Sequence, residues 1–410
     1  MTVKTVLIIA QDFSPKGVTA SRRPGYMAKY LPEFGWNPIV LTRKWTEDNC
    51  NYDPTIVPNL SEQIPRYEID IPPRSRLSLA SLRRLAYRSL YPGKHPIGFI
   101  DEGKRLIDEI LKTHNVDAIW STAPPNSVLS LGSYAAQQSG KPWIADFRDV
   151  WQWIPSPFVR FTLPLRFHHE RNELRHATTI IAVSKGFAET IGKRVNRKVD
   201  VICHGYDEEI FAVKRDSSIQ KFSIVYTGGL RLGRPNLRPL LDAIDLLIRA
   251  KKVDPSKISL DFYGIGNAEH LERMFGGHKH KYLVHDHGPI PREKVLEKQR
   301  QSALLLAATH PGMPGWLGSK MIEYVVSGRP ILAIPKDHDC IDELLAETST
   351  GISATDPEEI AKLLSYWYEE WESTGAITLS ADENAIALYS GREQAKKLAM
   401  KLNKSVAEHG

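Results

Sequence analysis

Hydrophobic and polar positions follow a repeating order along this chain. Short continuous apolar runs, typical of buried strands, alternate with longer stretches in which apolar residues recur every three or four positions, typical of helices. The first such unit is a strand at 5–10, a polar loop at 11–23, a helix at 24–34 and a second strand at 38–42. This order predicts a doubly wound α/β domain, which receives ligands at the carboxyl ends of its parallel strands.

The alternation continues through the first half of the chain and starts again after the polar stretch 214–221. Further strands are predicted at 117–121, 143–147, 179–183 and 200–203, and then at 222–227, 258–263, 281–285, 303–308 and 331–335. Further helices are predicted at 99–113, 127–139, 237–249, 357–371 and 393–403. Because 410 residues exceed the usual size of one hydrophobic core, we expect two domains, 1–207 and 208–380, followed by a C-terminal segment 381–410.

The segment between the predicted strands 303–308 and 331–335 carries the strongest functional signal. Three glycines in it would let the backbone approach a ligand closely: Gly312, Gly315 and Gly318. Ser319 is the expected N-cap of a short helix, so that Lys320 and Glu323 lie near its N-terminus. Free backbone N–H groups and the positive end of the helix dipole attract anions there, which predicts a phosphate site. Alternatively, Glu323 only complements the dipole.

Residues 318–332 read G-S-K-M-I-E-Y-V-V-S-G-R-P-I-L. This string resembles the nucleotide-sugar signature of retaining family-4 GT-B glycosyltransferases (glycosyl transferases group 1). The resemblance implies that Glu323 holds the ribose hydroxyls of the donor, with Gly318, Ser319 and Lys320 around it. The family pattern also carries an earlier glutamate, and Gly315 stands at its place here. The usual carboxylate contact to the donor sugar is therefore missing, and the identity of the sugar stays open.

Two glycine loops extend this resemblance. In the family, the loop corresponding to 228–235 supplies an arginine and a lysine that clamp the donor diphosphate. Gly229 occupies the arginine position here, Arg234 falls where the lysine is expected, and Arg231 could compensate. The N-terminal segment also resembles the family, and Gly17 would then be the backbone pivot beside the donor phosphates. The alternative for Gly17 is a plain turn glycine.

Asp149 follows the predicted strand 143–147, at the end of the strand where an open α/β sheet presents its functional loops. The string PWIADFRDVW around it again resembles this group of glycosyltransferases, and it stands where many relatives have a histidine-containing loop. The resemblance implies that Asp149 orients the acceptor hydroxyl. A pairing of Asp149 with Arg148, or a cap on the next helix, is the structural alternative.

The resemblance implies an α/β protein of the GT-B class, with two facing Rossmann-like doubly wound domains and an interdomain cleft, in which the final helix crosses back to the N-terminal domain. The implied reaction moves a sugar from a nucleotide-sugar to a hydroxyl of a glycan or lipid-linked acceptor, with retention and without metal or other cofactor. Lys320, Arg234 and Asp149 are the candidate catalytic residues. Two alternatives remain: a nucleotide-sugar 2-epimerase of the same fold, and a noncatalytic nucleotide- or nucleic-acid-binding protein.

The amino-acid composition limits the class of protein and the partners to be expected. Hydrophobic residues make up 42% of the chain and charged residues 25%, as in an ordinary globular protein. A net charge of +6 permits anionic partners without choosing between phosphates, acidic lipid and nucleic acid. Cys50, Cys203 and Cys340 are far apart in sequence, which indicates neither a disulfide framework nor a zinc knuckle.

Two stretches, 73–96 and 156–175, combine arginine or histidine with aromatic residues and leucine. Such a mixture suits the face of an anionic membrane. The alternative is a solvated basic helix with leucines facing the core. The apolar run 5–10 is too short for a signal peptide, and no apolar run approaches membrane-spanning length. We therefore expect a cytoplasmic protein that contacts the inner face of the membrane peripherally and binds no nucleic acid.

Two further sets of residues could be taken for metal ligands. Four histidines occur within ten residues: His278, His280, His285 and His287. Nothing in a strand pattern makes their side chains converge, so no metal site is expected from them. Asp337 and Asp339 form the kind of aspartate pair that a metal-dependent GT-A glycosyltransferase would use. They follow the predicted strand 331–335, however, which is not the architectural setting of that pair in a GT-A enzyme.

Overall fold

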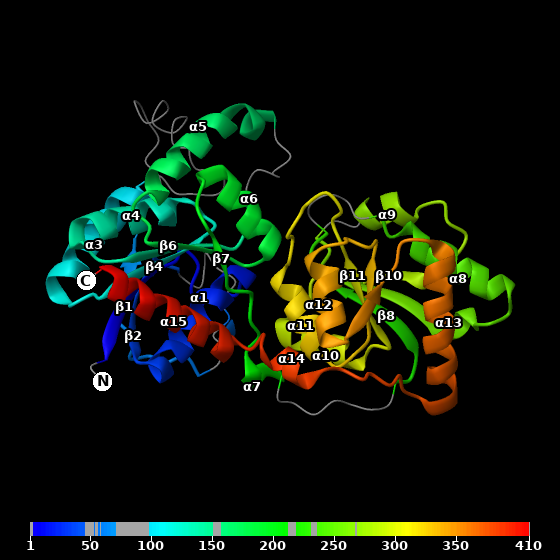
Figure 1. Cartoon of the computed structure of the whole chain (residues 1–410). Helices are drawn as coiled ribbons and strands as arrows, with labels where there is room; N and C mark the ends of the chain where they lie inside the picture. The colour runs from blue at the N-terminus through cyan, green and yellow to red at the C-terminus, as the bar shows by residue number, and fades with distance from the viewer. Residues whose placement is uncertain are drawn as a thin grey trace. The chain divides into compact units, whose positions relative to one another are not determined.

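The computed structural model describes residues 3–45, 53, 56–57, 59–70, 98–150, 157–211, 219–230, 236–266 and 269–409. The chain divides into two compact units (Figure 1). Unit 1 comprises Met1–Ile210 and Tyr389–Gly410, and unit 2 comprises Phe211–Leu388. The sequence placed these divisions at 207/208 and 380/381.

Unit 1 is built on a seven-stranded parallel sheet in the order β3-β2-β1-β4-β5-β6-β7. The strands are β1 (Lys4–Ile9), β2 (Trp36–Arg43), β3 (Arg66–Ile69), β4 (Ala118–Ala123), β5 (Trp143–Phe147), β6 (Thr179–Ala182) and β7 (Asp200–Val201). The helices are α1 (Thr19–Tyr30), the 3₁₀ helix η1 (Leu31–Phe34), α3 (Phe99–Thr113), α4 (Ser127–Ser139), α5 (Pro157–Leu174), α6 (Lys185–Val195), α7 (Glu208–Phe211) and α15 (Gly391–His409). The strand order reverses between β1 and β4, where open α/β sheets bind their ligands.

Helix α1 begins at Thr19, earlier than the expected start at Pro24, so the proline lies inside the helix. Proline is common in the first turn of a helix, where its missing N–H is not needed. Pro24 has no N–H to donate to the carbonyl of Ala20, four residues before it. The Arg148 guanidinium supplies the missing donor, with Nη1 at 2.6 Å from the Ala20 oxygen. A residue more than a hundred positions away therefore makes the proline tolerable.

The strands at the centre of unit 1 are buried along their whole length. Every residue of β4 and of β5 is buried, because parallel strands in this arrangement are covered on both faces. Helix α15, at the C-terminal end of the chain (Figure 1), packs into the same core. Its Leu398 and Leu402 are fully buried. A Cβ added to Gly205 would lie only 2.9 Å from the Cα of Gly391, so these two glycines allow the close approach at the start of α15.

Unit 2 contains a six-stranded parallel sheet in the order β10-β9-β8-β11-β12-β13. The strands are β8 (Phe222–Thr227), β9 (Ile258–Tyr263), β10 (Val284–Asp286), β11 (Leu304–Ala308), β12 (Ile331–Ile334) and β13 (Gly351–Ser353). The helices are α8 (Arg238–Arg249), η5 (Pro255–Lys257), α9 (Glu269–Phe275), η6 (Lys281–Leu283), α10 (Arg292–Gln301), α11 (Ser319–Val326), α12 (Cys340–Thr348), α13 (Pro357–Thr374) and α14 (Glu383–Ala387). Its strand order reverses between β8 and β11. The prediction of two doubly wound parallel-sheet domains is confirmed.

Aromatic side chains close one side of the unit 2 core. Phe222 on β8 packs against Tyr368 and Trp371 of α13, with ring centroids 5.2 Å and 5.6 Å apart. The Trp371 indole N–H donates to the carbonyl of Ile219 at 2.8 Å, so the polar atom of this buried ring is satisfied.

None of the helices in the described part of the chain has the length and apolar character needed to cross a lipid bilayer.

Candidate functional site

The candidate site of unit 2 lies at the carboxyl ends of β8 and β11, on either side of the point where the strand order reverses. Helix α11 is attached to the end of β8 by hydrogen bonds. The Thr227 N–H donates to the Tyr324 hydroxyl at 2.8 Å, and the Gln299 amide donates to the Thr227 hydroxyl at 2.9 Å. All three residues are buried. This small network fixes where the N-terminus of α11 lies.

The N-cap of α11 is Gly318, whose backbone is extended, with φ −71° and ψ 145°. The expectation that Ser319 is the N-cap is therefore wrong, because Ser319 is the first helical residue. Glycine has no side chain that could accept from the first N–H groups, and the N-cap residue accepts only through its carbonyl, from the Met321 N–H at 2.9 Å. Lys320 is the second helical residue, and Glu323 lies in the second turn rather than the first.

The Lys320 ammonium lies 3.8 Å from the centre of the Tyr226 ring and 5.8 Å from that of Tyr324. Burial lowers the pKa of Lys320 from 10.5 to about 7, although Glu323 acts in the opposite direction. Within the described residues the ammonium forms no ion pair. A partly exposed cation with so little compensation is a good partner for an incoming anion.

Two glycines after β8 keep this region open. Gly228 has a φ of +95°, which a residue with a Cβ rarely adopts, and its N–H donates to the Tyr263 carbonyl at 2.7 Å. Gly229 is exposed, and its carbonyl accepts from the Tyr226 hydroxyl at 3.2 Å. Arg231 and Arg234, the cations expected from this loop, lie outside the described residues.

Glu323 is buried and pairs with Arg292, the first residue of α10, at 3.0 Å. The carboxylate is thus held by a cation from another helix rather than only complementing its own helix dipole. Sequence reasoning missed Arg292. Its place directly after Pro291 at a helix start was the only local signal.

The loop before α11 is tied down by two aspartates. Gly315, at a φ of +80°, donates its N–H to the Asp339 carboxylate. Asp337 accepts from the backbone N–H groups of Asp339, Ile341 and Asp342, and so caps the start of α12. In the described structure, both carboxylates therefore serve the backbone.

His310, two residues after β11, also belongs to this region. Burial, and to a smaller extent the neighbouring Lys320, lowers the pKa of His310 to about 4. The imidazole is therefore neutral at physiological pH, and its ring meets Trp316 edge-on with centroids 5.8 Å apart. The sequence analysis missed His310, although its position just after a buried strand is where functional side chains occur in such sheets.

Three of the four histidines pair with three different aspartates. His278 lies 3.2 Å from Asp242, His280 lies 2.9 Å from Asp245, and His287 lies 2.7 Å from Asp261. Over the described ranges, no three or more His, Cys, Asp or Glu side chains form a group that could hold a metal ion. Cys203 and Cys340 carry free thiols, and Cys50 lies outside these ranges.

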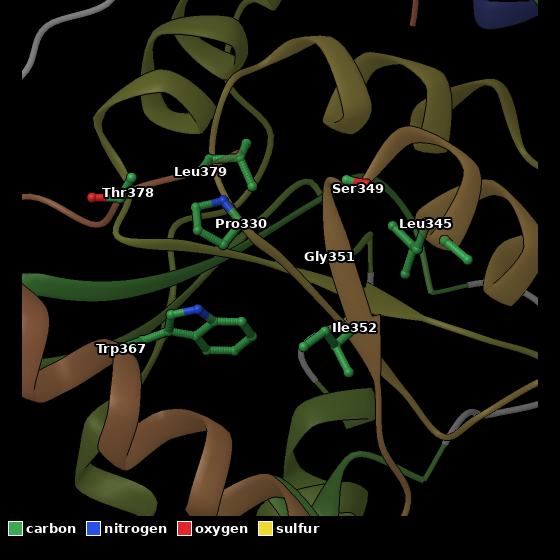
Figure 2. A pocket seen from close by; sticks show the side chains of 9 residues that line it. Pro330, Leu345, Ser349, Gly351, Ile352, Trp367, Thr378 and Leu379 are labelled. Atoms are coloured by element: carbon green, nitrogen blue, oxygen red, sulfur yellow. The ribbon is translucent and has the colours of Figure 1, made fainter. Parts of the chain in front are cut away.

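A separate hollow of about 340 Å³ lies at the amino ends of β12 and β13 (Figure 2). Its lining residues are uncharged, and Trp367 and Ile352 form part of the wall. Pro330 precedes β12 and Gly351 begins β13, so this hollow is at the opposite edge of the sheet from the N-terminus of α11. It therefore offers no charged group for chemistry and is not part of the candidate site.

Asp149 and Gly17 belong to unit 1. Asp149 lies just after β5 and is partly exposed, and burial raises its pKa from 3.8 to about 6. Its neighbour Arg148 donates to the carbonyls of Ala20, Ala123 and Pro124. Gly17 lies just before α1 without a positive φ, as a plain connecting glycine would.

A fully buried ion pair supports the region around Asp149. Arg23 donates from Nε and Nη2 to the two carboxylate oxygens of Asp146 at 2.8 Å and 2.9 Å. The same guanidinium donates to the carbonyls of Ile202 at 3.0 Å and Cys203 at 2.6 Å. Because each nitrogen of the guanidinium donates to an acceptor, this pair links α1, β5 and the segment after β7 at the carboxyl edge of the sheet.

Comparison with known proteins supports the resemblance in unit 1. Residues 20–210 match the family model described as Glycosyltransferase Family 4. A search of curated proteins found no match.

Solved structures are similar over nearly the whole chain. Anabaena HepE in complex with UDP and glucose is 16% identical, with 98% of this chain and 100% of that chain covered and a TM-score of 0.64. Sucrose-phosphate synthase from Thermosynechococcus elongatus is 14% identical, with 99% and 100% covered and a TM-score of 0.66. A Listeria monocytogenes protein assigned as a UDP-N-acetylglucosamine 2-epimerase is 14% identical, with 100% and 98% covered and a TM-score of 0.55.

These similarities establish the fold class. The two Rossmann-like parallel-sheet units match those of GT-B glycosyltransferases, so the predicted fold class is confirmed. At such low identity the likeness speaks for the fold, and the activity has to be argued from the site.

Replacing Lys320 with methionine should stabilise the empty protein, and most strongly at low pH. In the folded protein Lys320 loses its proton near pH 7, whereas in the unfolded chain it keeps it up to its ordinary pKa of 10.5. The penalty for burying the charge is therefore complete below pH 7 and fades between pH 7 and 10.5. We expect Lys320→Met to raise the melting temperature at pH 6 by at least about 2 °C, or about 1 kcal/mol for a unit of this size, and by less at pH 9.5.

The matched control is Lys362→Met, on the exposed side of α13. Its effect on the melting temperature should be the same at both pH values. If Lys320→Met also changed the melting temperature by the same amount at pH 6 and at pH 9.5, the ammonium would be fully solvated.

Proposed function

We propose that this chain is a glycosyltransferase that moves a sugar from a nucleotide-sugar to a hydroxyl acceptor. The observation that carries the proposal is the under-compensated Lys320 ammonium at the N-terminus of α11, at the strand-order reversal of unit 2. A cation beside uncapped helical N–H groups suits a diphosphate. The family match over 20–210 and the HepE structure, which holds UDP and glucose, give independent support.

The donor contacts follow from the same geometry. Glu323, held by Arg292, accepts hydrogen bonds from the ribose hydroxyls of the nucleotide. The glycines of the surrounding loops leave room for the diphosphate beside the backbone: Gly228, Gly229, Gly315 and Gly318. Arg231 and Arg234 complete the cationic clamp in this proposal. The absence of a glutamate at Gly315 leaves the sugar itself to be read by other groups.

Departure of the nucleoside diphosphate increases the negative charge on its β-phosphate. Lys320 stabilises that charge in place of a metal ion, and its effect grows as the bond to the sugar breaks. An ammonium with a pKa near 7 is only partly protonated in the empty site. A bound diphosphate raises that pKa and draws a proton onto the lysine. In this proposal the transfer proceeds with retention of configuration.

Asp149 acts on the acceptor. With a pKa raised to about 6, its carboxylate is ionised at neutral pH and can accept a hydrogen bond from the attacking hydroxyl. As the pH falls through 6, the group gains a proton and loses this ability. Acceptor turnover should therefore decline on the acid side.

We further propose that the protein works at the cytoplasmic face of a membrane, on a glycan or lipid-linked acceptor. Helix α5 exposes Phe161 at 84% and Leu165 at 52%, four residues apart on one face. The expectation that the cations of 156–175 also face the lipid is wrong for Arg166, which is buried. The other basic stretch, 73–96, lies outside the described residues.

An epimerase acting on the nucleotide-sugar is the second candidate, because the Listeria structure covers both units. An epimerase would change the sugar without any acceptor. Incubation with the donor alone, followed by NMR of the sugar, separates the two activities. Formation of a 2-epimer would contradict the transferase proposal.

Changing Glu323 to glutamine should weaken donor binding. The charged acceptor of the ribose hydroxyls is lost, at a cost of about 1.5–3 kcal/mol, or about 10- to 150-fold in Kd. Isothermal titration with UDP measures this directly. Glu297→Gln, at a half-buried residue of α10 whose carboxylate pairs with Lys294, is the matched control and should leave the affinity unchanged. Equal affinity in both variants would remove Glu323 from the site.

Changing Lys320 to methionine should lower kcat more than it raises the donor KM, since the ammonium acts mainly on the developing charge. Wild-type activity should survive excess EDTA. Loss of activity on chelation, restored by magnesium or manganese, would contradict the metal-free mechanism.

A further inference from the structure

Unit 1 contains a cationic cluster that the donor site does not use. It surrounds the loop after β1, next to the strand-order reversal between β1 and β4. Lys16 pairs with Asp12 at 2.5 Å, and Arg43 and Arg148 both lie close enough to interact with the same carboxylate. The cations come from the ends of three neighbouring segments: the β1 loop, β2 and the turn after β5.

Trp45 and the Gln11 carbonyl hold this cluster together. The Gln11 oxygen accepts from the Thr42 hydroxyl at 3.1 Å, from the Arg43 N–H at 3.3 Å and from the Trp45 indole at 3.2 Å. The Trp45 ring in turn carries two cations. Its centre lies 3.4 Å from the Lys16 ammonium and 4.2 Å from the Arg43 guanidinium. The cations are thus positioned before any ligand arrives, which reduces the entropy lost on binding.

Positive charge exceeds negative charge in this cluster. Lys16, Arg43 and Arg148 share the carboxylate of Asp12, and Asp149 lies beside Arg148. Asp146, which also interacts with Arg148, is paired with Arg23. Arg43 forms no ion pair with any described residue. Nearby, burial together with the guanidinium groups of Arg23 and Arg148 holds the pKa of His204 well below its usual range. An excess of fixed cations at the ligand-binding edge of a sheet favours an anion there.

The properties of the individual groups narrow the kind of anion. Arg148 is committed to three backbone carbonyls, so it contributes charge and rigidity rather than free donors. Among the described residues, the Arg43 guanidinium forms no side-chain hydrogen bond, and the Lys16 ammonium donates to Asp12. A guanidinium fork next to an ammonium suits the several oxygens of a phosphate. The Trp45 ring already carries two cations, so it is a poor platform for stacking a neutral sugar.

We propose that Lys16 and Arg43, supported by Arg148 and Trp45, bind a phosphate group of the acceptor. That the phosphate belongs to a sugar acceptor rests on the proposed glycosyltransferase function. The existence of a phosphate site at these residues does not. The substrate class is then a sugar or lipid that carries a phosphate or diphosphate near the hydroxyl that receives the new sugar. Asp149, beside Arg148, is the adjacent group that meets that hydroxyl.

The test measures phosphate binding after Lys320, one cation of the proposed donor site, has been removed. The full-length Lys320→Met protein is titrated with inorganic pyrophosphate, and it is co-sedimented with phosphatidylcholine vesicles with or without dicetyl phosphate. Adding Arg43→Gln should weaken binding of the phosphate probe by about tenfold or more, because a charge-assisted contact is lost. The matched control is Lys44→Gln, the exposed neighbour that pairs with Asp70 at 2.8 Å. That change should leave binding as it was.

The outcomes separate the possible sources of the phosphate. Binding of pyrophosphate alone, lost with Arg43→Gln, supports a soluble phosphorylated acceptor. Binding that requires dicetyl phosphate in the vesicle, lost in the same way, supports a lipid phosphate. Failure of both probes to bind, or equal loss with Lys44→Gln, would overturn the proposal. Melting temperatures of all variants show whether each is folded.

A parallel titration with UDP keeps this inference distinct from the proposed function. Arg43→Gln in the otherwise unchanged protein should bind UDP as the wild type does. A loss of UDP affinity would overturn the assignment, because Arg43 would then belong to the donor site. If the wild type fails to bind UDP while the pyrophosphate result holds, the glycosyltransferase proposal fails and the phosphate site stands.

Discussion

The candidate donor site depends on one half-buried ammonium that lacks an adequate counter-charge. Aromatic rings of Tyr226 and Tyr324 surround Lys320, and the nearest carboxylate, Glu323, is already paired with Arg292. The lysine therefore holds its proton weakly in the empty protein and strongly once an anion is present. Such a site stabilises negative charge where it develops, because the cation is positioned in advance and no water has to reorganise.

The rest of unit 2 serves to hold that arrangement. The hydrogen bonds from Gln299 to Thr227 and from Thr227 to Tyr324 tie α11 to the end of β8. Asp339 fixes the loop that leads into the helix through its bond to Gly315. In unit 1, a buried interaction likewise fixes the backbone at the carboxyl edge of the sheet. There the buried pair of Arg23 with Asp146 fixes the backbone from which Arg148 and Asp149 project.

Much of this architecture could be predicted from the sequence, and the exceptions have physical causes. The strands Trp143–Phe147 and Phe222–Thr227 were predicted at their observed bounds because continuous apolar runs mark strands buried on both faces. Strand β3 was missed because Arg66–Ile69 is mostly polar and covered on one side at most. The start of α1 was misplaced because Arg148 is remote in sequence. Its guanidinium donates to the Ala20 carbonyl the hydrogen bond that Pro24 cannot donate.

The residues of the candidate site also divide into those that the sequence could predict and those that it could not. Lys320 and Glu323 stand within one short motif, so the sequence could propose them. Arg292 and His310 gain their roles only from neighbours that folding brings to them. Their local signals, a helix start and a position after a buried strand, do not identify those neighbours. The excess of cations around Asp12 was hidden for the same reason, since its members come from separate segments of the chain.

Proton uptake on nucleotide binding tests the central claim most directly. At pH 8 the empty site holds Lys320 mostly neutral, and a bound diphosphate should restore its charge. Isothermal titration with UDP in two buffers of different ionisation enthalpy should therefore report uptake of about one proton per UDP in the wild type and none in Lys320→Met. Binding of UDP without proton uptake, or with equal uptake in the variant, would contradict the account.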